Sequence, residues 1–305
     1  MTLINHSLLS PFSIQLAIDG SDNAVDAALL VRSLPLPGGS RVAVVGVSDP
    51  GQSQSPYEAT LGAILDDIQQ TNSDGGIEAT YWMWRGHTAK TLIEFADEHQ
   101  PDLIVVGVRG LSATLKMLMG GIAQQIVEDA CWPVLVVRHP FNGIQRVLLA
   151  VDGSPYSRRA AAYVAKFPLP AHAEVSVIHV LPASNDLNLI SPNLRFGGQW
   201  APSAPPLVET QLVEQQREME ERQGQAILRD VRRILETAKI KSHGVLIRGD
   251  PANEILNYVL AHEIDLVVAG SRGFSAIKEW GLGSISRKLV HYAACSVLFV
   301  RGEPR

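Results

Sequence analysis

An internal repeat restricts the fold of this chain more than any other feature. Residues 13–28, SIQLAIDGSDNAVDAA, match residues 145–161, QRVLLAVDGSPYSRRAA, at an offset of 133 residues. Further along, residues 84–110 match residues 247–273 at an offset of 163 residues. The chain therefore consists of two copies of one unit, and the second copy is longer by 30 residues.

The additional residues of the second copy lie around 182–215. This segment is rich in Pro, Ser, Asn and Gly, which predicts a long loop or a lid. A polar run at 217–238 follows it, and the three- and four-residue spacing of its charges predicts a helix with a solvated face. The sequence leaves open whether the insert is a decoration, a lid or a partner site.

Each copy alternates apolar runs with amphipathic segments, which predicts a parallel sheet with helices on both faces. In the second copy we expect the strands at 146–151, 174–180, 243–249, 265–271 and 296–301. The predicted fold class is α/β, with two tandem doubly wound, Rossmann-like domains that each contain a mostly parallel five-stranded sheet. We predict domain boundaries at 1–140 and 141–305, with the link RHPFNG at 138–143.

The composition argues against several classes of protein. With 26 basic and 31 acidic residues the net charge is −5, whereas general nucleic-acid binders are usually basic. No apolar run approaches the roughly 20 residues that span a bilayer, and the first residues do not resemble a secretory signal, so we expect a cytoplasmic protein. Cys131 and Cys295 show no paired metal-ligand spacing, so we expect two buried structural thiols.

A glycine-rich stretch at 267–290, VVAGSRGFSAIKEWGLGSISRKLV, suggests a ligand site. A strand-like run ends at Gly270, and a helix-like run starts after Gly283 and Ser284. Ligands of doubly wound sheets bind beyond the carboxyl ends of the strands, and the free N–H groups of a helix start bind phosphate. Ser284 would add a hydroxyl donor or cap the helix. The pattern is neither a Walker loop nor G-x-G-x-x-G, and turns alone could explain it, although its recurrence in both copies argues against that.

The spacing Gly270-x2-Gly273-x9-Gly283-Ser284 is similar to the nucleotide-binding signature of the universal stress protein family. The segments AVDGS, RGDPANEI and SVLFVR, and the pair His179-Val180 that ends the second strand, resemble that family as well. The resemblance covers nearly the whole chain, twice, and indicates a tandem member.

The resemblance implies a set of nucleoside contacts in the second copy. In ATP-binding members, the Asp after the first strand contacts the nucleoside, which corresponds to Asp152. The Val at the end of the second strand packs near the base, which corresponds to Val180. Gly270 and Gly273 would lie along the ribose and the phosphates.

The same resemblance implies the phosphate contacts. Gly283, Ser284 and Ile285 would hold the phosphates through backbone groups and the hydroxyl. Arg272 either reaches a phosphate or is a solvated surface residue. Asp152 could help to hold Mg²⁺ with the phosphates. The segment Asp-Gly-Ser that it begins also favours a turn and a helix cap, and both roles can hold at once.

The first copy departs from this signature at one position. It keeps the residues Asp19, Val47, Gly107, Gly110 and Gly120. Gly121 replaces the Ser or Thr, which removes the hydroxyl but keeps the backbone N–H. Because a hydrogen bond to a charged group contributes roughly 1.5–3 kcal/mol, we expect the first site to bind about tenfold more weakly than the second, or not at all.

No catalytic motif accompanies the site, and His179 lies on an apolar strand, where a packed residue is expected rather than a base. Any ATP hydrolysis should therefore be slow. Three hypotheses stay open: a regulatory protein that binds an adenine nucleotide, a slow ATP hydrolase, and a protein–protein scaffold. The resemblance further implies a pairing of the last strands, 134–138 and 297–301, because single-domain members of the family dimerise through that strand. Since exposed apolar edge strands tend to pair, we predict that these two pair within the chain as an internal pseudo-dimer, with a further homodimer undetermined.

Overall fold

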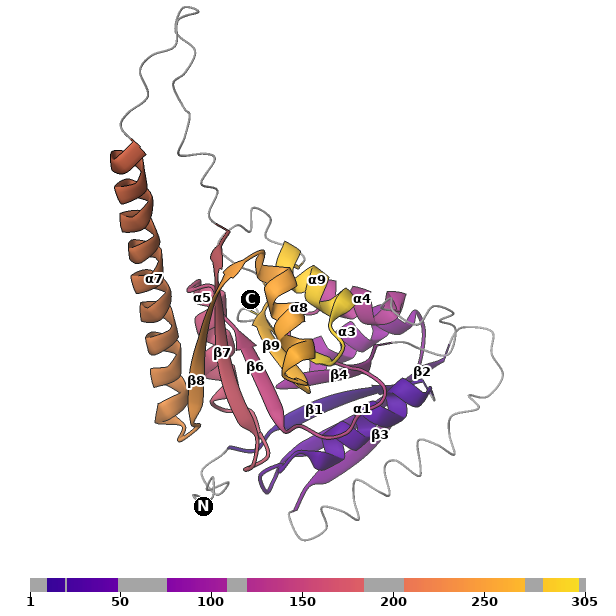
Figure 1. Cartoon of the computed structure of the whole chain (residues 1–305). Helices are drawn as coiled ribbons and strands as arrows, with labels where there is room; N and C mark the ends of the chain where they lie inside the picture. The colour runs from indigo at the N-terminus through magenta and orange to yellow at the C-terminus, as the bar shows by residue number, and fades with distance from the viewer. Residues whose placement is uncertain are drawn as a thin grey trace, which may run out of the picture.

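A computed structural model describes most of the chain (Figure 1). The described residues are 10–19, 21–48, 76–108, 120–183, 206–271 and 282–301, with side chains described throughout except at 206–212.

Each repeat folds into five strands with helices between them. The first repeat contains β1 (Ser13–Ile18), α1 (Asp22–Ser33), β2 (Arg41–Ser48), β3 (Glu78–Arg85), α3 (Thr88–His99), β4 (Leu103–Gly107), α4 (Gly121–Asp129) and β5 (Val134–Val137). The second contains β6 (Arg146–Ala150), α5 (Pro155–Val164), β7 (Glu174–Pro182), α7 (Pro206–Thr237), β8 (Ser242–Gly249), α8 (Pro251–Ala261), β9 (Leu266–Gly270), α9 (Ser284–Tyr292) and β10 (Ser296–Val300).

The ten strands form one sheet in the order β3-β2-β1-β4-β5-β10-β9-β6-β7-β8. Within each repeat all pairs are parallel, and β5 and β10 join the two halves as an antiparallel pair. The predicted fold class, two tandem doubly wound α/β units with five parallel strands each, is confirmed. The boundaries at 1–140 and 141–305 stay a prediction.

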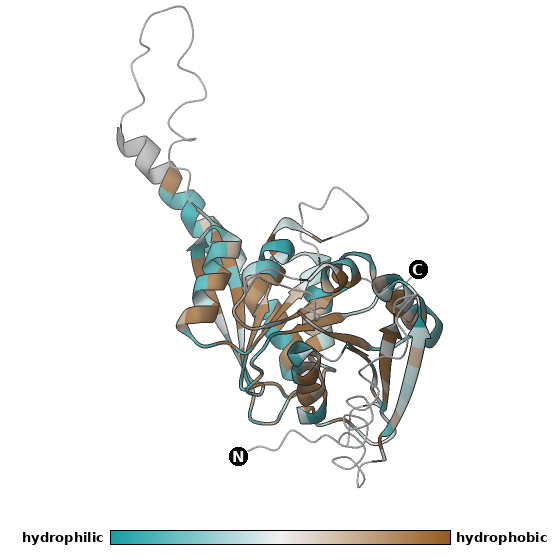
Figure 2. Ribbon diagram, turned by 90° about the vertical axis from the view of Figure 1, so that its right-hand side faces the viewer, coloured by the Kyte–Doolittle hydropathy of each residue, from teal (hydrophilic) through white to brown (hydrophobic). Residues whose placement is uncertain are grey.

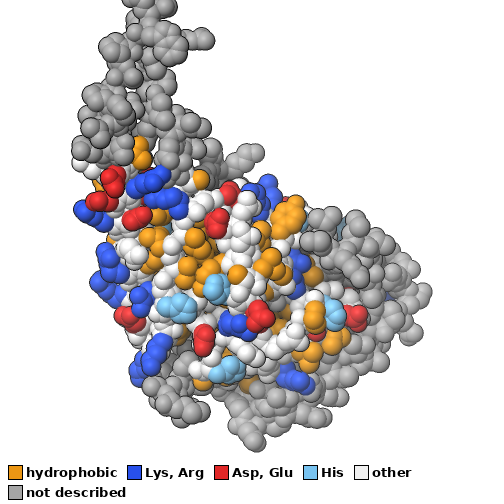
Figure 3. All heavy atoms as spheres, in the orientation of Figure 1, with side chains coloured by type: hydrophobic (Ala, Val, Ile, Leu, Met, Phe, Trp, Pro, Cys, Tyr) orange, Lys and Arg blue, Asp and Glu red, His pale blue; other side chains and the backbone are white. Residues whose placement is uncertain are grey.

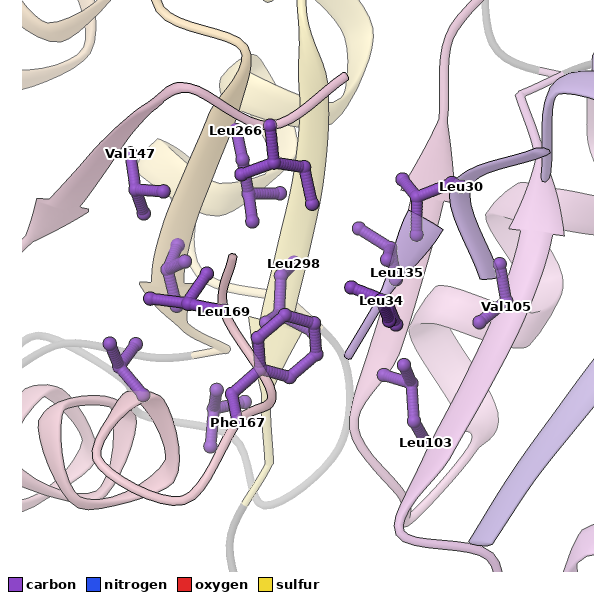
Figure 4. Packing of buried hydrophobic residues seen from close by; sticks show 14 of the residues in the cluster. Leu30, Leu34, Leu103, Val105, Leu135, Val147, Phe167, Leu169, Leu266 and Leu298 are labelled. Atoms are coloured by element: carbon purple, nitrogen blue, oxygen red, sulfur yellow. The ribbon is translucent and has the colours of Figure 1, made fainter. Parts of the chain in front are cut away.

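The junction between the repeats is an apolar strand pair. Leu298 lies opposite Leu135, and Phe299 lies opposite Val134. All four side chains are buried, and Figure 4 shows Leu135 and Leu298 on neighbouring strands of one packed layer. The predicted pairing of the two last strands within the chain is therefore confirmed, and it removes both strands from the sheet edge.

Two apolar layers enclose the sheet, one on each face. Helices α1, α5 and α7 supply one layer, and α3, α4, α8 and α9 supply the other. Each layer contains residues of both repeats, so the core is continuous across the junction. The helices turn their hydrophobic sides toward the sheet (Figure 2), which is the usual way for an α/β fold to bury both faces of a parallel sheet.

Short polar residues start several of the helices. Ser21 caps α1 by accepting from the N–H of Ala24, and Ser154 caps α5 by accepting from the N–H of Ser157. Pro155 follows as the first residue of α5, where its missing N–H has no cost. These caps fix where the chain leaves the carboxyl ends of β1 and β6.

Helix α7 is longer than predicted. It begins at Pro206 rather than at 217, so the expected loop at 182–215 is wrong for residues 206–215. Residues 184–205 of the insert lie outside the described part of the chain. The C-terminal half of α7 buries Leu228, Val231 and Leu235 on the sheet, while residues 214–219 are exposed on turns that extend past it (Figure 1).

The two cysteines have different surroundings. Cys295 is buried, as predicted, but Cys131 is exposed, so the prediction of two buried thiols is wrong for Cys131. Burial raises the pKa of the Cys295 thiol to about 12. No helix in the described ranges is long and apolar enough to cross a membrane.

Candidate functional site

The predicted site residues gather where the strand order reverses. In the second repeat the chain passes from β6 to β7 on one side, and later returns to β9 on the other side. Ala150, the last residue of β6, lies opposite Ala269 of β9. Asp152 and Gly270 therefore extend from two neighbouring strand ends that flank the switch point, where ligands of doubly wound folds bind.

The first repeat places its corresponding residues in the same way. Strands β1 and β4 are parallel neighbours at the switch point, with Leu16 opposite Val105. Asp19 follows β1, and Gly107 ends β4. The two halves of the sheet thus place the corresponding residues at equivalent positions of the fold.

The aspartates hold a tight turn in front of a helix. The Oδ1 atom of Asp152 accepts from the backbone N–H of Ser154 at 2.9 Å, and that of Asp19 accepts from the backbone N–H of Ser21 at 3.0 Å. Each serine, rather than the aspartate, caps the following helix. The turn and the helix cap expected for the segment Asp-Gly-Ser at 152–154 are therefore confirmed: Asp152 holds the turn and Ser154 caps the helix.

The first glycine of each motif is required by a helix that passes close to it. A Cβ on Gly270 would lie 3.0 Å from the backbone of Tyr156 in α5, and one on Gly107 would lie 2.8 Å from the backbone of Asn23 in α1. The close approach thus involves a helix start of the same repeat. Gly273, Gly110 and Arg272 lie outside the described residues.

The last glycine of each motif begins a helix. Gly283 is the N-cap of α9 with φ −64° and ψ 161°, and Gly120 is the N-cap of α4 with φ −68° and ψ 149°. Arg287 N makes the first intrahelical bond, to Gly283 O at 2.9 Å. The N–H groups of residues 284–286 precede that bond, so they point outward from the helix start.

A pair of backbone hydrogen bonds joins the last glycine of each motif to the strand ends. Gly283 N donates to Ser271 O at 3.0 Å, and Ser271 N donates to Val300 O at 3.0 Å. In the first repeat, Gly120 N donates to Val108 O at 2.9 Å, and Val108 N donates to Val137 O at 2.8 Å. Both helix starts are therefore held against the strand ends in the same way, although the two sequences differ.

The hydroxyl groups distinguish the two repeats. Ser284 is the first residue of α9 and is exposed, and no side chain caps the helix. It therefore does not serve the cap role considered from the sequence. In the first repeat Gly121 takes its place, and a Cβ there would meet no atom of the described residues within 4 Å. The missing hydroxyl is thus a difference in chemistry and not in available space.

Ser286 is a site residue that the sequence analysis missed. Its buried hydroxyl donates to Gly270 O at 3.0 Å and so joins α9 to the end of β9. Ala123 takes its place in the first repeat. The sequence contains a signal, the pair Ser284-x-Ser286, but two serines near a helix start do not by themselves indicate which of them faces the strand.

The apolar side of the site is more closed in the second repeat. Val180 of β7 is buried, and half-buried Ile285 of α9 packs in the same layer on one face of the sheet. In the first repeat, Val47 is half-buried and Ile122 is 40% exposed. The second site therefore offers the better wall for a flat apolar group.

His179 is a packed residue, as predicted. It is buried in β7, and its Nδ1 atom lies 2.8 Å from Val151 O, beside Asp152. Gly224 of α7 is so close that a Cβ there would lie 3.2 Å from the His179 ring. The ring is therefore enclosed between β7 and α7 and does not face a reacting group.

Helix α7 is anchored next to the site. Gly153 has φ +83°, and a Cβ on it would lie 2.8 Å from Ile227 of α7. Arg248 pairs with Glu220 of α7 and also donates to Pro182 O at 3.0 Å, which ties the helix to the ends of β7 and β8. The hydrogen bond from Arg248 lowers the pKa of the Glu220 carboxyl.

An ion pair joins the two helices α8 and α9 next to the candidate site. Lys288 of α9 lies 3.5 Å from Asp250, the N-cap of α8. The face in Figure 3 shows Lys and Arg interspersed with Asp and Glu. No group of three or more metal-ligating side chains occurs among the residues with described positions.

Comparison with known proteins identifies relatives of both repeats. The model of the universal stress protein family matches residues 13–138 and again residues 143–301. A universal stress protein of Bacillus subtilis, YxiE, is 28% identical over 156 residues, which cover 51% of this chain and 98% of that protein. A universal stress protein of Mycolicibacterium smegmatis is 25% identical over 273 residues, which cover 87% of this chain and 82% of that protein.

One solved structure matches nearly the whole chain. A universal stress protein of Archaeoglobus fulgidus has a TM-score of 0.62 and 20% identity, and the match covers 95% of this chain and 98% of that one. At this identity the likeness supports the two-repeat fold and carries no information about the ligand.

Proposed function

Because the chain belongs to the universal stress protein family, we propose that its second repeat binds ATP and that occupancy of this site regulates the protein's shape or its choice of partner. The observation that carries the proposal is the start of α9. Its outward N–H groups, Ser284 and the switch point with Asp152 lie at one end of the sheet. Such a helix start favours phosphate through its free N–H groups and its dipole.

Each part of the nucleotide has a proposed neighbour. Asp152 contacts the nucleoside, and Val180 with Ile285 supplies an apolar wall for the base. The backbone from Gly283 to Ile285 and the Ser284 hydroxyl bind the phosphates, with Gly270, Gly273 and Arg272 along the loop. Mg²⁺ would bind mainly through the phosphates, with Asp152 as the nearby carboxylate.

The first repeat is proposed to bind more weakly. It has the same backbone frame at Gly120, but it lacks both hydroxyls, at Gly121 and at Ala123, and Ile122 is more exposed than Ile285. Asp19, Val47, Gly107 and Gly110 would contact a ligand there if one binds. A hydrogen bond to a charged group contributes roughly 1.5–3 kcal/mol, so an affinity difference of about tenfold or more is expected.

A slow ATP hydrolase is the second candidate function, since the same site could position a water next to a bound phosphate. The enclosure of His179 disfavours it, because a hydrolase benefits from a group that orients the water. Turnover of ATP by the purified protein, lost in Asp152→Ala without unfolding, would support the hydrolase. We also propose that the protein is located in the cytoplasm, and we leave a homodimer of two chains undetermined.

Calorimetric titration of ATP with Mg²⁺ tests the proposed site. We expect one strong site per chain, about tenfold weaker in Ser284→Ala and lost in Gly283→Val. The matched variants in the first repeat, Gly121→Ala and Gly120→Val, should leave that site unchanged.

Two results of the same titration would contradict the proposal. Two equal sites would refute the difference between the repeats. No binding at all would favour the scaffold hypothesis, in which the glycines serve only the turns and helix contacts.

A further inference from the structure

Two arginines cross the junction between the repeats. Arg138 follows β5 of the first repeat, and its Nη2 atom donates to Val290 O at 2.8 Å and His291 O at 3.2 Å, in the last turn of α9 in the second repeat. Arg301 follows β10 of the second repeat, and its Nη2 atom donates to carbonyl oxygens in the last turn of α4 in the first repeat. These acceptors are Val127 O and Glu128 O.

The helices that receive these arginines are the two that begin at the glycine motifs. Helix α9 starts after Gly283 and α4 starts after Gly120, and each has nine residues, which corresponds to a length of about 14 Å. The last carbonyl groups of a helix lack partners within it, and a cation there is favourable. Each arginine thus binds the C-terminal end of a helix in the other repeat. The N-terminal end of that helix is the one that would meet the phosphates.

Backbone bonds connect each arginine to the helix start of its own repeat. Gly120 N bonds to Val108, and Val108 N bonds to Val137 O, the residue before Arg138. Gly283 is joined in the same manner, through Ser271 and Val300, to Arg301. The two helix starts, two strand ends and two arginines therefore form a closed ring of contacts around the pseudo-twofold junction.

We propose that Arg138 is a positioning residue for the phosphate site of the second repeat, and that Arg301 has the same role for the first repeat. This proposal rests on the proposed function. It adds that the phosphate site of each repeat depends on an arginine of the opposite repeat. Arg138 touches no part of the ligand. It fixes the helix axis, and with it the direction of the N–H groups of residues 284–286.

A cap that only stabilises the fold would act differently from a positioning residue. Loss of a simple cap would lower the thermal midpoint and leave the preference among ligands unchanged. Loss of a positioning residue would weaken ligands that carry phosphates and spare those that do not. Adenosine is the matched ligand without phosphates, so the ratio of ATP affinity to adenosine affinity separates the two roles.

The experiment compares Arg138→Gln with Arg301→Gln in the full chain, by titration of ATP with Mg²⁺ and of adenosine. We expect Arg138→Gln to weaken ATP binding about threefold to tenfold and to leave adenosine binding unchanged. Arg301→Gln removes an equivalent cap and should leave ATP binding at the second repeat unchanged. Arg138→Lys keeps a cation at the helix end and should therefore bind ATP more tightly than Arg138→Gln, although more weakly than the wild-type chain. It replaces Arg138→Gln in the comparison if that variant does not fold.

Amide hydrogen exchange supplies a readout that needs no nucleotide. Arg138→Gln should speed exchange in α9 and not in α4, and Arg301→Gln should do the reverse. Equal effects of both variants on ATP affinity, or equal losses of ATP and adenosine affinity in Arg138→Gln, would overturn the positioning role. A wild-type chain that binds no ATP would instead overturn the proposed function, while the exchange pattern would still decide whether the arginines act across the junction.

Discussion

Gly107 and Asn23 lie so close together that the backbone carbonyl carbon of Asn23 would be 2.8 Å from a Cβ on the glycine. The second repeat has the same relationship between Gly270 and Tyr156, at 3.0 Å. In both cases the neighbour is backbone at the start of a helix, which cannot rotate away as a side chain could. The first glycine of the motif is therefore needed by the fold before any ligand binds.

We expect Gly107→Ala and Gly270→Ala to destabilise the chain by about 1–3 kcal/mol each, the usual cost of forcing a group into a packed region. Gly107→Ala should cost more, because its neighbour lies closer. Urea titration of the free energy of unfolding measures both effects in the absence of nucleotide.

Gly121→Ala is the matched control for these glycine variants. It also adds one methyl group to a motif glycine, but within the described part of the chain that methyl group would meet no atom within 4 Å. We expect no destabilisation, and a small gain from helix propensity of at most about 1 kcal/mol. Equal losses of stability in all three variants would show that close packing is not the reason for these glycines.

Restoring the hydroxyl of the first repeat should restore its affinity. The space around Gly121 accepts a side chain, and Gly120 already holds the helix start as Gly283 does. Gly121→Ser should therefore strengthen ATP binding at the first repeat by about tenfold, equivalent to one hydrogen bond to a charged group. Calorimetry should then detect a second site per chain, and an unchanged titration would assign the difference to another residue, with Ala123 as the next to test.

The repeat made most of the fold predictable. Once two copies are recognised, the alternation of strands and helices gives each half its parallel sheet. The junction at strands 134–138 and 297–301 followed from the resemblance to the family, whose single-domain members pair through the last strand. The start of α7 was missed because Pro206 ends a proline-rich stretch that reads as a loop. Proline is also common as the first residue of a helix, and the sequence alone does not separate these two roles.

The site was predictable only where its residues are adjacent in the chain. The spacing from Gly283 to Ser284 correctly indicated a helix start. The contact of Gly270 with Tyr156 and the crossing of Arg138 to α9 join residues more than 100 positions apart. Such contacts depend on how the helices pack, and no local pattern encodes them.

A buried glutamine in the first repeat offers a test of one packing difference from the second repeat. Gln15 in β1 is 1% exposed; its Nε2 atom donates to Leu92 O at 2.8 Å, and its Oε1 atom has no hydrogen-bond partner among the described residues. Leu148 takes its place in the second repeat and is fully buried. Gln15→Leu should stabilise the chain by about 1 kcal/mol, because the unsatisfied buried oxygen is removed.

The reverse change in the second repeat is the control. Leu148→Gln should lower the free energy of unfolding by about 2 kcal/mol or more, because it buries an amide with no partner prepared for it. Both values come from urea titration. A loss of stability in Gln15→Leu would indicate that the bond to Leu92 contributes more than the unsatisfied oxygen costs.

The Cys295 thiol should make stability fall at alkaline pH. Burial raises its pKa to about 12 in the folded chain, above the ordinary value of about 8.5 in the unfolded chain. Between these two values the unfolded state loses the proton first and the folded state keeps it. Stability is therefore intact below about pH 8.5 and falls by up to about 1.4 kcal/mol per pH unit up to about pH 12.

Cys295→Ala removes this titration and should flatten the fall, although the smaller side chain lowers stability at neutral pH. Urea titrations between pH 8 and pH 10.5 measure the slope, which is independent of that constant loss. Burial also raises the pKa of Tyr163, whose hydroxyl donates to Asp102 O at 2.9 Å. Part of the loss of stability above pH 10 should therefore persist in Cys295→Ala. That remaining loss should become smaller when Tyr163→Phe is added. Cys131→Ala is the matched control, since it removes the other thiol of the chain, which is exposed. An equal change of slope in Cys131→Ala and Cys295→Ala would contradict the assignment to the buried thiol.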